Sequence, residues 1–247
     1  MTAAHEEEPV RWARTRSFTR RGGRIPEQHK WAYEKHGDAY ILDLPTLGDS
    51  GSTAIDPSFV AQPSQWFGRN APVVLEVGSG SGDALVAGAQ AHPDWDFIAF
   101  EVWRPGVAQA IHRLQRRGLT NVRFATLDAH VAFDTAFEPG SIAEVWTYFP
   151  DPWPKTKHHK RRIVGPVFAD RVNSLLSPSG LWRLATDWPE YADHMHDVLD
   201  DRPDWSLVST EREESRPITR FERKGTKAGR PITDLAYAKV EPSSEPS

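Results

Sequence analysis

Five short apolar runs in the middle of the chain alternate with stretches of helical spacing. The runs have the length of strands and cover residues 73–77, 96–102, 121–126, 143–149 and 181–186. Residues 84–91, 106–117, 162–176 and 190–199 are expected to form the helices between them. Strict alternation is typical of a parallel sheet with helices on both faces. We therefore expect an open, doubly wound α/β domain, with residues 205–209 and 233–239 as two final strands.

The domain organisation follows from length and local composition. A chain of 247 residues, of which 38% are hydrophobic, can bury one sizeable core. Residues 1–15 and 241–247 are rich in Glu, Pro and Ser and are expected to be disordered tails. We expect residues 16–240 to form a single domain, with a basic extension over residues 16–70 ahead of the α/β core. Residues 38–67 are rich in loop-forming residues, and their sequence indicates no particular element.

Several classes of protein are disfavoured by what the sequence lacks. No segment approaches the roughly 20 consecutive apolar residues of a membrane span, and the acidic start of the chain lacks the apolar region of a secretory signal. We therefore expect a cytoplasmic protein without a membrane partner. The absence of cysteine removes disulfides, thiolate zinc sites and cysteine nucleophiles, and no metal site is expected.

A glycine-rich turn directly follows the first expected strand. Gly78, Gly80 and Gly82 have the spacing G-x-G-x-G, which differs from the G-x-G-x-x-G of dinucleotide-binding proteins. In an α/β sheet, the turn after the first strand is where a nucleotide-like ligand meets the carboxyl edge. The turn therefore predicts a cofactor site, although an ordinary tight turn would have the same glycines.

Acidic residues stand at the ends of three successive expected strands. Glu76 precedes the glycines, Glu101 follows the second strand, and Asp128 follows the third. A carboxylate in the position of Glu101 can accept both hydroxyls of a ribose. The three acids together favour a cationic cofactor without phosphates, as S-adenosylmethionine is. Each acid also has a structural alternative, since Glu76 could cap a turn, Glu101 could be solvated, and Asp128 could cap the following helix.

Residues 151–162, with the sequence DPWPKTKHHKRR, place one carboxylate ahead of a cluster of cations. Pro152 and Pro154 fix two φ angles, which predicts a stiff, non-helical loop that holds Asp151 and Trp153 in set directions. The rest of the segment has five Lys or Arg residues, two His residues and no acid. Such a run is either a solvated face or a patch that binds a polyanion.

Two further basic segments interrupt a chain whose formal net charge is −4. Residues 11–24 contain six Arg and no acid, and residues 216–230 contain six Lys or Arg and one Glu. Clustered cations in an acidic chain indicate a local surface for nucleic acid and argue against a general nucleic-acid coat. In the segment 151–162, the residues expected to contact the backbone of a nucleic acid are Lys157, His158, His159, Lys160, Arg161 and Arg162.

The chain resembles the bacterial tRNA (guanine-N7-)-methyltransferases, which are class I S-adenosylmethionine-dependent enzymes. The resemblance covers most of the chain and rests on six motifs, RSFTRRGGR (16–24), LEVGSGSG (75–82), FEVWRPGV (100–107), DPWPKTKHHKRR (151–162), ATDWPEYA (185–192) and RPITRFERKG (216–225). The chain departs from the family pattern at Ser79 and Ser81 in the glycine turn, and at Trp103, where the family often has His.

The resemblance implies a Rossmann-like class I methyltransferase fold with a mostly parallel, seven-stranded sheet. It implies that the enzyme methylates N7 of the variable-loop guanine of tRNA, at position 46. The expected assembly is a monomer or a homodimer. The implied cofactor-binding residues are Glu76, Gly78, Gly80, Gly82, Glu101, Asp128 and Asp151, with Asp151 also the catalytic residue. The implied substrate-binding residues are Lys155, Asp187, Thr219, Arg220, Phe221 and Glu222.

Three features in this set have alternative interpretations. Asp187 could cap a helix, and residues 216–230 could be a plain connector in place of a basic loop that closes over the target nucleotide. Trp153, Trp188 and Phe221 could stack on a base, although most of the ten Trp residues are expected in the core. A small-molecule methyltransferase would share the acids without needing the basic segments. A non-catalytic RNA-binding protein would have no use for Glu101 and Asp128.

Overall fold

The computed structural model describes residues 23–46, 55–56 and 58–241. Both expected tails, except for Glu241, and all of the basic segment 11–24 except Gly23 and Arg24 lie outside the described residues. A single sheet spans the chain from residue 73 to residue 239. Among the described residues, no helix is long and apolar enough to cross a membrane.

Seven strands form the sheet, as expected, in the order β3-β2-β1-β4-β5-β7-β6. Their bounds are β1 Val73–Val77, β2 Asp96–Phe100, β3 Val122–Ala125, β4 Ile142–Tyr148, β5 Leu176–Thr186, β6 Trp205–Ser209 and β7 Thr233–Lys239. The first five strands are parallel, whereas β7 runs antiparallel to both β5 and β6. The strand order reverses between β1 and β4, and ligands of α/β proteins bind at the carboxyl edge beside such a reversal.

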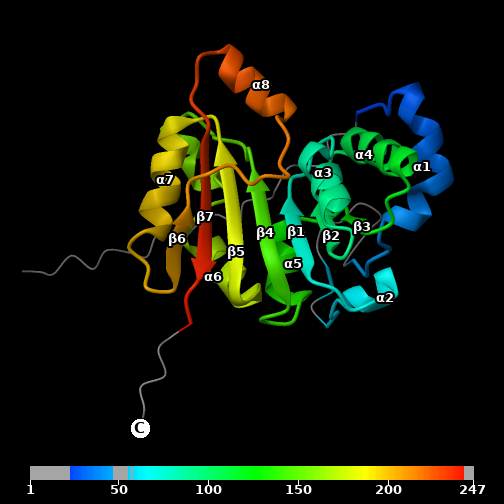
Figure 1. Ribbon diagram of the computed structural model, residues 1–247, viewed down its shortest axis with the longest axis horizontal. Helices are drawn as coiled ribbons and strands as arrows, with labels where there is room; N and C mark the ends of the chain where they lie inside the picture. Colours follow the sequence, from blue (N-terminus) through cyan, green and yellow to red (C-terminus); the bar gives the residue numbers. More distant parts are fainter. Residues whose placement is uncertain (1–22, 47–54, 57, 242–247) are drawn as a thin grey trace, which may run out of the picture.

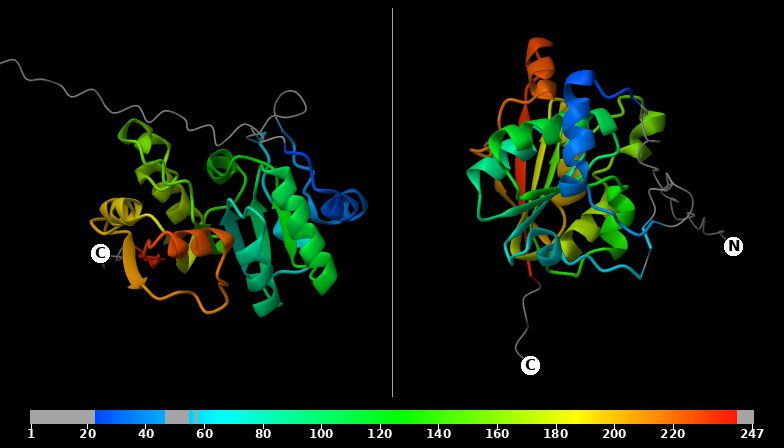
Figure 2. Two further views of the ribbon diagram at one scale, coloured as in Figure 1. Left: turned by 90° about the horizontal axis from the view of Figure 1, so that it is seen from above. Right: turned by 90° about the vertical axis from the view of Figure 1, so that its right-hand side faces the viewer.

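Helices cover both faces of the sheet (Figure 1). Their bounds are α1 Glu27–Tyr40, α2 Pro63–Phe67, α3 Asp83–Ala91, α4 Arg104–Arg117, α5 Ala129–Thr135, α6 Pro166–Leu175, α7 Pro189–Leu199 and α8 Arg220–Lys227. Side chains of α1, α3 and α4 share one core cluster, and those of α5, α6 and α7 share the other. The orange helix α8 covers neither face and stands above the carboxyl edge of the sheet (Figures 1 and 2).

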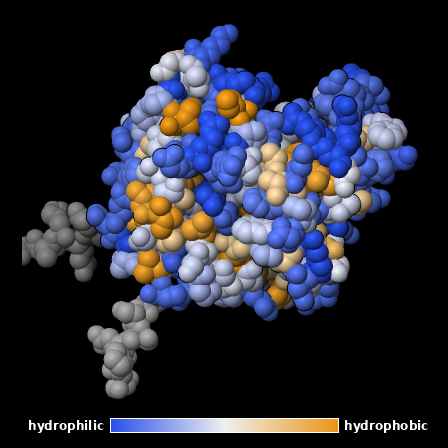
Figure 3. Space-filling model, viewed as in Figure 1, coloured by the Kyte–Doolittle hydropathy of each residue, from blue (hydrophilic) through white to orange (hydrophobic). Residues whose placement is uncertain are grey.

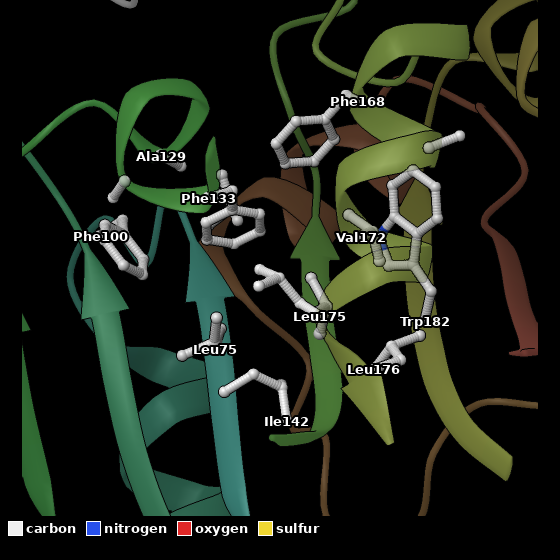
Figure 4. Close-up of a cluster of buried hydrophobic side chains, with 14 of the residues drawn as sticks. Leu75, Phe100, Ala129, Phe133, Ile142, Phe168, Val172, Leu175, Leu176 and Trp182 are labelled. Atoms are coloured by element: carbon white, nitrogen blue, oxygen red, sulfur yellow. The ribbon is translucent and has the colours of Figure 1, made fainter. Parts of the chain in front are cut away.

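The larger core cluster lies between the sheet and α5–α7 (Figure 4). Phe133 of α5 stacks on Phe168 of α6, with ring centroids 5.3 Å apart, and meets Phe100 at the end of β2 edge-on. Trp182 of β5 is fully buried against Phe168. Burial of an aromatic side chain of this size contributes about 2–3 kcal/mol, so these contacts fix the strand ends that carry the candidate site.

The sequence did not predict α1 or α2, which lie in the expected basic extension, and it also missed a helix in each of two segments near the candidate site. Residues 151–162 were expected to be non-helical, but Thr156–Arg161 form a short 3₁₀ helix, η1. Residues 216–230 were expected to form a loop or a connector, but they contain α8. The helix expected over residues 162–176 begins only at Pro166, because Gly165 is extended (φ −158°) and Arg162 is drawn into contacts of its own.

Candidate active site

The glycine turn joins β1 to α3 and needs its glycines. Gly78, Gly80 and Gly82 have φ angles of 75°, 55° and 72°, in the left-handed region that side chains disfavour. A Cβ on Gly82 would also lie 2.7 Å from Cβ of Ala110 in α4. Gly106 was not among the predicted site residues, but it belongs to the same site, because a Cβ there would clash with the carbonyl oxygen of Gly80. The sequence feature that could have identified Gly106 is its place in the first turn of the helix that follows Glu101.

Glu101 holds this turn in place. Its Oε2 accepts a hydrogen bond from the Gly80 N–H at 2.6 Å, and its Oε1 accepts one from the Trp103 N–H at 2.6 Å. Burial raises the pKa of Glu101, and the negative charge of Asp151 raises it further. The hydrogen bonds from the N–H groups of Trp103 and Gly80 lower this pKa, because they stabilise the carboxylate. Because β4 pairs with β1, the segment that carries Asp151 leaves the sheet beside the glycine turn, at the point where the strand order reverses.

Glu76 is buried beside the turn, and its Oε2 has no hydrogen-bond partner among the described residues. Burial, together with the charges of Glu101 and Asp83, raises the pKa of Glu76 to about 8. The Ser79 Oγ and the Tyr148 hydroxyl are likewise buried without a partner among the described residues. Buried polar atoms are normally satisfied, so this group of atoms fits a polar, cationic ligand such as the ammonium and sulfonium groups of S-adenosylmethionine.

Asp128 adopts the capping role that the sequence left as an alternative. It is the N-cap of α5, and its Oδ1 accepts a hydrogen bond from the His130 N–H at 3.0 Å. Glu76 makes no capping hydrogen bond through Oε2 among the described residues, and Glu101 is buried and therefore not a solvated acid. Asp128 is nevertheless buried and follows the end of β3, just as Glu76 and Glu101 are buried at the ends of β1 and β2. Its contact with the cofactor therefore stays a prediction.

Asp151 is exposed on the segment that leaves β4. Two residues of this segment, Phe149 and Trp153, have positive φ angles of 52° and 45°, which non-glycine residues rarely adopt. Arg162 stabilises this segment, because its Nε donates a hydrogen bond to the Pro152 carbonyl at 3.0 Å. Its side chain is only 2% exposed, and its guanidinium lies 4.9 Å from the Tyr191 ring centre. Arg162 is thus used inside the protein and is not displayed for RNA.

The other cations after Asp151 do face solvent. Lys155, Lys157, Lys160 and Arg161 are exposed, and His158 and His159 are partly buried. The Arg161 guanidinium lies 5.0 Å from the Trp153 ring centre, so these two side chains form a flat, cationic surface. These cations follow β4 at the carboxyl edge of the sheet, and their role in binding a polyanion stays a prediction.

Asp187 follows β5 but does not cap α7, whose N-cap is Trp188. Its Oδ2 accepts hydrogen bonds from Nε and Nη2 of Arg230, at 3.0 and 2.5 Å. A Cβ on Gly225 of α8 would lie 2.5 Å from Cβ of Asp187, so α8 packs closely on this residue. Asp187 therefore supports α8.

The first turn of α8 stands over the glycine turn. Thr219 is the N-cap, and its Oγ1 accepts a hydrogen bond from the Glu222 N–H at 3.2 Å. The Arg220 N–H lies 3.4 Å from Oδ2 of Asp83, and the side chain of Phe221 lies beside Gly80. Arg220 and Phe221 are exposed, whereas Glu222 is buried.

A separate cavity of about 420 Å³ opens between α1 and the start of α4. Arg24, Lys30, Tyr33 and Arg104 are among its lining residues, and the Arg104 guanidinium lies 5.5 Å from the Tyr33 ring centre. Among the described residues, no group of three or more His, Asp or Glu could hold a metal ion.

Comparisons with known proteins identify the family of the chain. Residues 70–235 match the family model described as "Putative methyltransferase". The chain is 45% identical to the tRNA (guanine-N(7)-)-methyltransferase of Nocardioides sp. over 90% of this chain and 86% of the relative. It is 43% identical to the enzyme of the same name from Cutibacterium acnes, over 92% and 84% of the two chains.

The fold also matches a solved structure, the crystal structure of TrmN from Thermus thermophilus. The TM-score is 0.50, the identity is 18%, and the match covers 72% of this chain and 47% of that one. This similarity supports the Rossmann-like methyltransferase fold. The identity and coverage of the relatives settle the family: the chain belongs to the tRNA (guanine-N(7)-)-methyltransferases.

Proposed function

We propose that this enzyme methylates N7 of the guanine in the variable loop of tRNA, at position 46. Methylation of a tRNA guanine at N7 follows from the family, and the variable-loop position is the finer part of the proposal. One observation carries it. Buried acids border the glycine turn, and Asp151 beside them leads directly into the exposed cations of η1. The acids suit a cationic cofactor, and the cations suit an RNA backbone.

The methyl donor is S-adenosylmethionine, whose sulfonium supplies an activated methyl group when it is bound. We propose that Gly78, Gly80 and Gly82 let the backbone approach it closely, with Glu101 fixing the turn. Glu76 and Asp128 complete the acidic side of the site. The buried Oε2 of Glu76, which lacks a partner among the described residues, supports this arrangement.

Guanine N7 carries a free lone pair, so no proton has to be removed before it attacks a methyl carbon. The task of the protein is therefore to align the base and to stabilise the positive charge that develops on the purine. We assign this task to Asp151. Its exposed carboxylate can accept hydrogen bonds from guanine N1 and N2, and it lies on the segment that leaves β4 next to the end of β1.

The substrate side divides into direct and indirect contacts. Exposed Lys155, Arg220 and Phe221 are proposed to contact the RNA, and Lys157, His158, His159, Lys160 and Arg161 to contact its backbone. Asp187, Thr219 and Glu222 are engaged with α8 and its neighbours, so we propose that they position that helix. We also propose a cytoplasmic enzyme that acts as a monomer or a homodimer.

Replacing Asp151 with Asn tests the assignment. We expect the single-turnover methylation rate at saturating tRNA to fall by on the order of 100-fold, because one electrostatic contact to the charged product is lost. The tRNA affinity, measured by filter binding, should change little. Borohydride and aniline cleavage of the product should map 7-methylguanine to the variable loop in the wild-type reaction.

Asp94→Asn is the matched control. Asp94 is also exposed, but it precedes β2 at the opposite edge of the sheet, so its variant should keep the wild-type rate. An unchanged rate for Asp151→Asn would remove Asp151 from the mechanism. Cleavage at a guanine outside the variable loop would refute the proposed position without affecting the role of Asp151.

A further inference from the structure

Arg216 is a buried cation that joins two elements of the carboxyl edge. Its side chain is 1% exposed. Nη1 donates to Oε2 of Glu222 in α8 at 2.8 Å, and Nη2 donates to Oδ1 and Oδ2 of Asp234 in β7 at 2.7 and 2.8 Å. Charge-assisted hydrogen bonds of this kind fix direction as well as distance, because the guanidinium is planar. Arg216 therefore holds α8 against the first residues of β7.

The same guanidinium also contacts the end of β4. It lies 5.4 Å from the ring centres of both Tyr148 and Phe149. Phe149 has the positive φ of 52°, and its N–H donates to the Ala185 carbonyl at 2.7 Å. A non-glycine residue keeps such a conformation only where its surroundings hold it. Asp151 follows Phe149 by two residues. Arg216 therefore packs on the part of the chain that sets the direction of Asp151.

Arg216 also holds the first turn of α8 through its ion pair with Glu222. Glu222, its partner, is the third residue of α8 and is bound to the Thr219 cap. Phe221, which directly precedes Glu222, lies beside Gly80 of the cofactor turn. Glu222 Oε1 also accepts from Arg212, whose side chain is 35% exposed. Within the part of the chain that the structure describes, Arg216 lies over the rings that end β4 and Arg212 does not.

We propose that Arg216 is a positioning residue for methyl transfer. It fixes the start of α8, above the glycine turn, relative to the β4 segment that presents Asp151. Glu222 then acts through Arg216 and not by touching the substrate. This inference rests on the proposed role of Asp151, because a fixed distance between the two segments matters only if Asp151 meets the target base.

Arg216→Lys and Arg212→Lys form the matched test. A lysine at position 216 keeps the charge but cannot bridge two carboxylates and stack on two rings. We expect its single-turnover rate, at saturating tRNA and S-adenosylmethionine, to fall by on the order of 100-fold, because small misplacements are costly. The dissociation constants of both ligands should stay within about 3-fold of wild type, as expected for an interaction needed only in the transition state. Arg212→Lys should keep the wild-type rate.

Hydrogen exchange gives a second readout. Arg216→Lys should accelerate exchange in residues 148–153 and in residues 219–227 together, although these segments are far apart in the chain. Arg212→Lys should leave residues 148–153 unchanged. If Arg216→Lys fails to fold, the triple variant Arg216→Met, Glu222→Gln, Asp234→Asn removes the charges together, an exchange that buried ion pairs often tolerate. It should fold and still be slow.

Four results would overturn the inference. These are a wild-type rate for Arg216→Lys, an equal loss for Arg212→Lys, ligand dissociation constants that rise as much as the rate falls, and a wild-type rate for the folded triple variant. Asp151→Asn is measured in parallel. A slow Asp151→Asn beside a fast Arg216→Lys overturns this inference alone, whereas a fast Asp151→Asn overturns the role of Asp151 and this inference with it.

Discussion

Glu76 is a buried carboxyl group at the end of β1 whose Oε2 has no partner among the described residues. Burial and the charges of Glu101 and Asp83 raise its pKa from 4.5 to about 8, and its neighbour Tyr148 stays neutral because burial raises the pKa of that hydroxyl. Glu76 is therefore protonated at pH 7 without ligand. A cationic ligand beside it would favour the carboxylate and lower its pKa.

We predict that binding of S-adenosylmethionine at pH 7 releases about one proton from Glu76, and that affinity rises with pH up to about pH 8. Calorimetry in two buffers of different ionisation enthalpy measures this release directly. The Glu76→Gln variant, which keeps Glu101 and Asp83, should bind more weakly and release much less. Equal proton release by the variant and the wild type would contradict the prediction.

The same pKa shift has a consequence for stability. The unfolded chain releases the Glu76 proton at a lower pH than the folded chain does. The ligand-free protein should therefore lose stability as the pH rises from about 4.5 to about 8. In urea unfolding at pH 8, Glu76→Gln should be more stable than the wild type, and the difference should vanish near pH 4. No difference at pH 8 would show that Glu76 is not desolvated.

At the scale of residues, the sequence predicts what lies next to a strand end. Glu76, Glu101 and the glycines of the turn are found in this way, because parallel strands bring their carboxyl ends to one edge. Arg216 and Arg230 are not found. Their acidic partners, Asp234 and Asp187, lie 18 and 43 positions away, and only the antiparallel return of β7 brings them together.

At the scale of elements, predictions succeed where apolar residues repeat and fail where they do not. β1 lies where it was expected, since every residue in its run is buried. In contrast, α8 and η1 have the sequences RFERKGTK and TKHHKR, which lack an apolar stripe. Capping by Thr219 and packing on Asp187 stabilise α8, and neither contact is visible in a hydrophobic pattern.

Arg161, the last residue of η1, and Arg162, which follows it, have opposite surroundings. Arg162 is buried and donates to the Pro152 carbonyl, whereas Arg161 is exposed on Trp153. We predict that Arg162→Ala lowers the free energy of unfolding by about 1–3 kcal/mol, because a partly buried carbonyl loses its donor and the buried packing of the arginine side chain is lost. Arg161→Ala should cost at most about 1 kcal/mol, the value of an exposed cation–π contact. Urea unfolding of both variants measures the difference.

In RNA binding, Arg161→Ala should have the larger effect on the salt dependence and Arg162→Ala the smaller one. Arg161→Ala should reduce the slope of log affinity against log salt by about one unit, as the loss of one phosphate contact does. Arg162→Ala should leave that slope unchanged, even if distortion of the segment weakens binding at every salt concentration. A smaller slope for Arg162→Ala would mean that its guanidinium leaves the protein interior when RNA binds.

At the scale of the whole molecule, a chain of net charge −4 has to bind a polyanion. The sheet topology resolves this conflict, because it brings η1 and α8 to the same edge although they lie far apart in the chain. Viewed from above, α8 lies across this edge (Figure 2). Apolar side chains gather instead near β6 and α7 (Figure 3), where Leu207 and Val208 of the edge strand are 40% and 53% exposed.

Position, rather than total charge, should therefore control tRNA affinity. Lys155→Ser with Lys157→Ser removes two exposed cations at the carboxyl edge, and Arg116→Ser with Arg117→Ser removes two in the last turn of α4, at the opposite edge. Both double variants change the net charge from −4 to −6, because each loses two positive charges. We predict that the first reduces the salt slope of tRNA binding by about two units and that the second leaves it unchanged. Filter binding between about 50 and 200 mM salt measures both slopes. Equal slopes for the two variants would show that the overall field of the protein, and not this edge, guides the RNA.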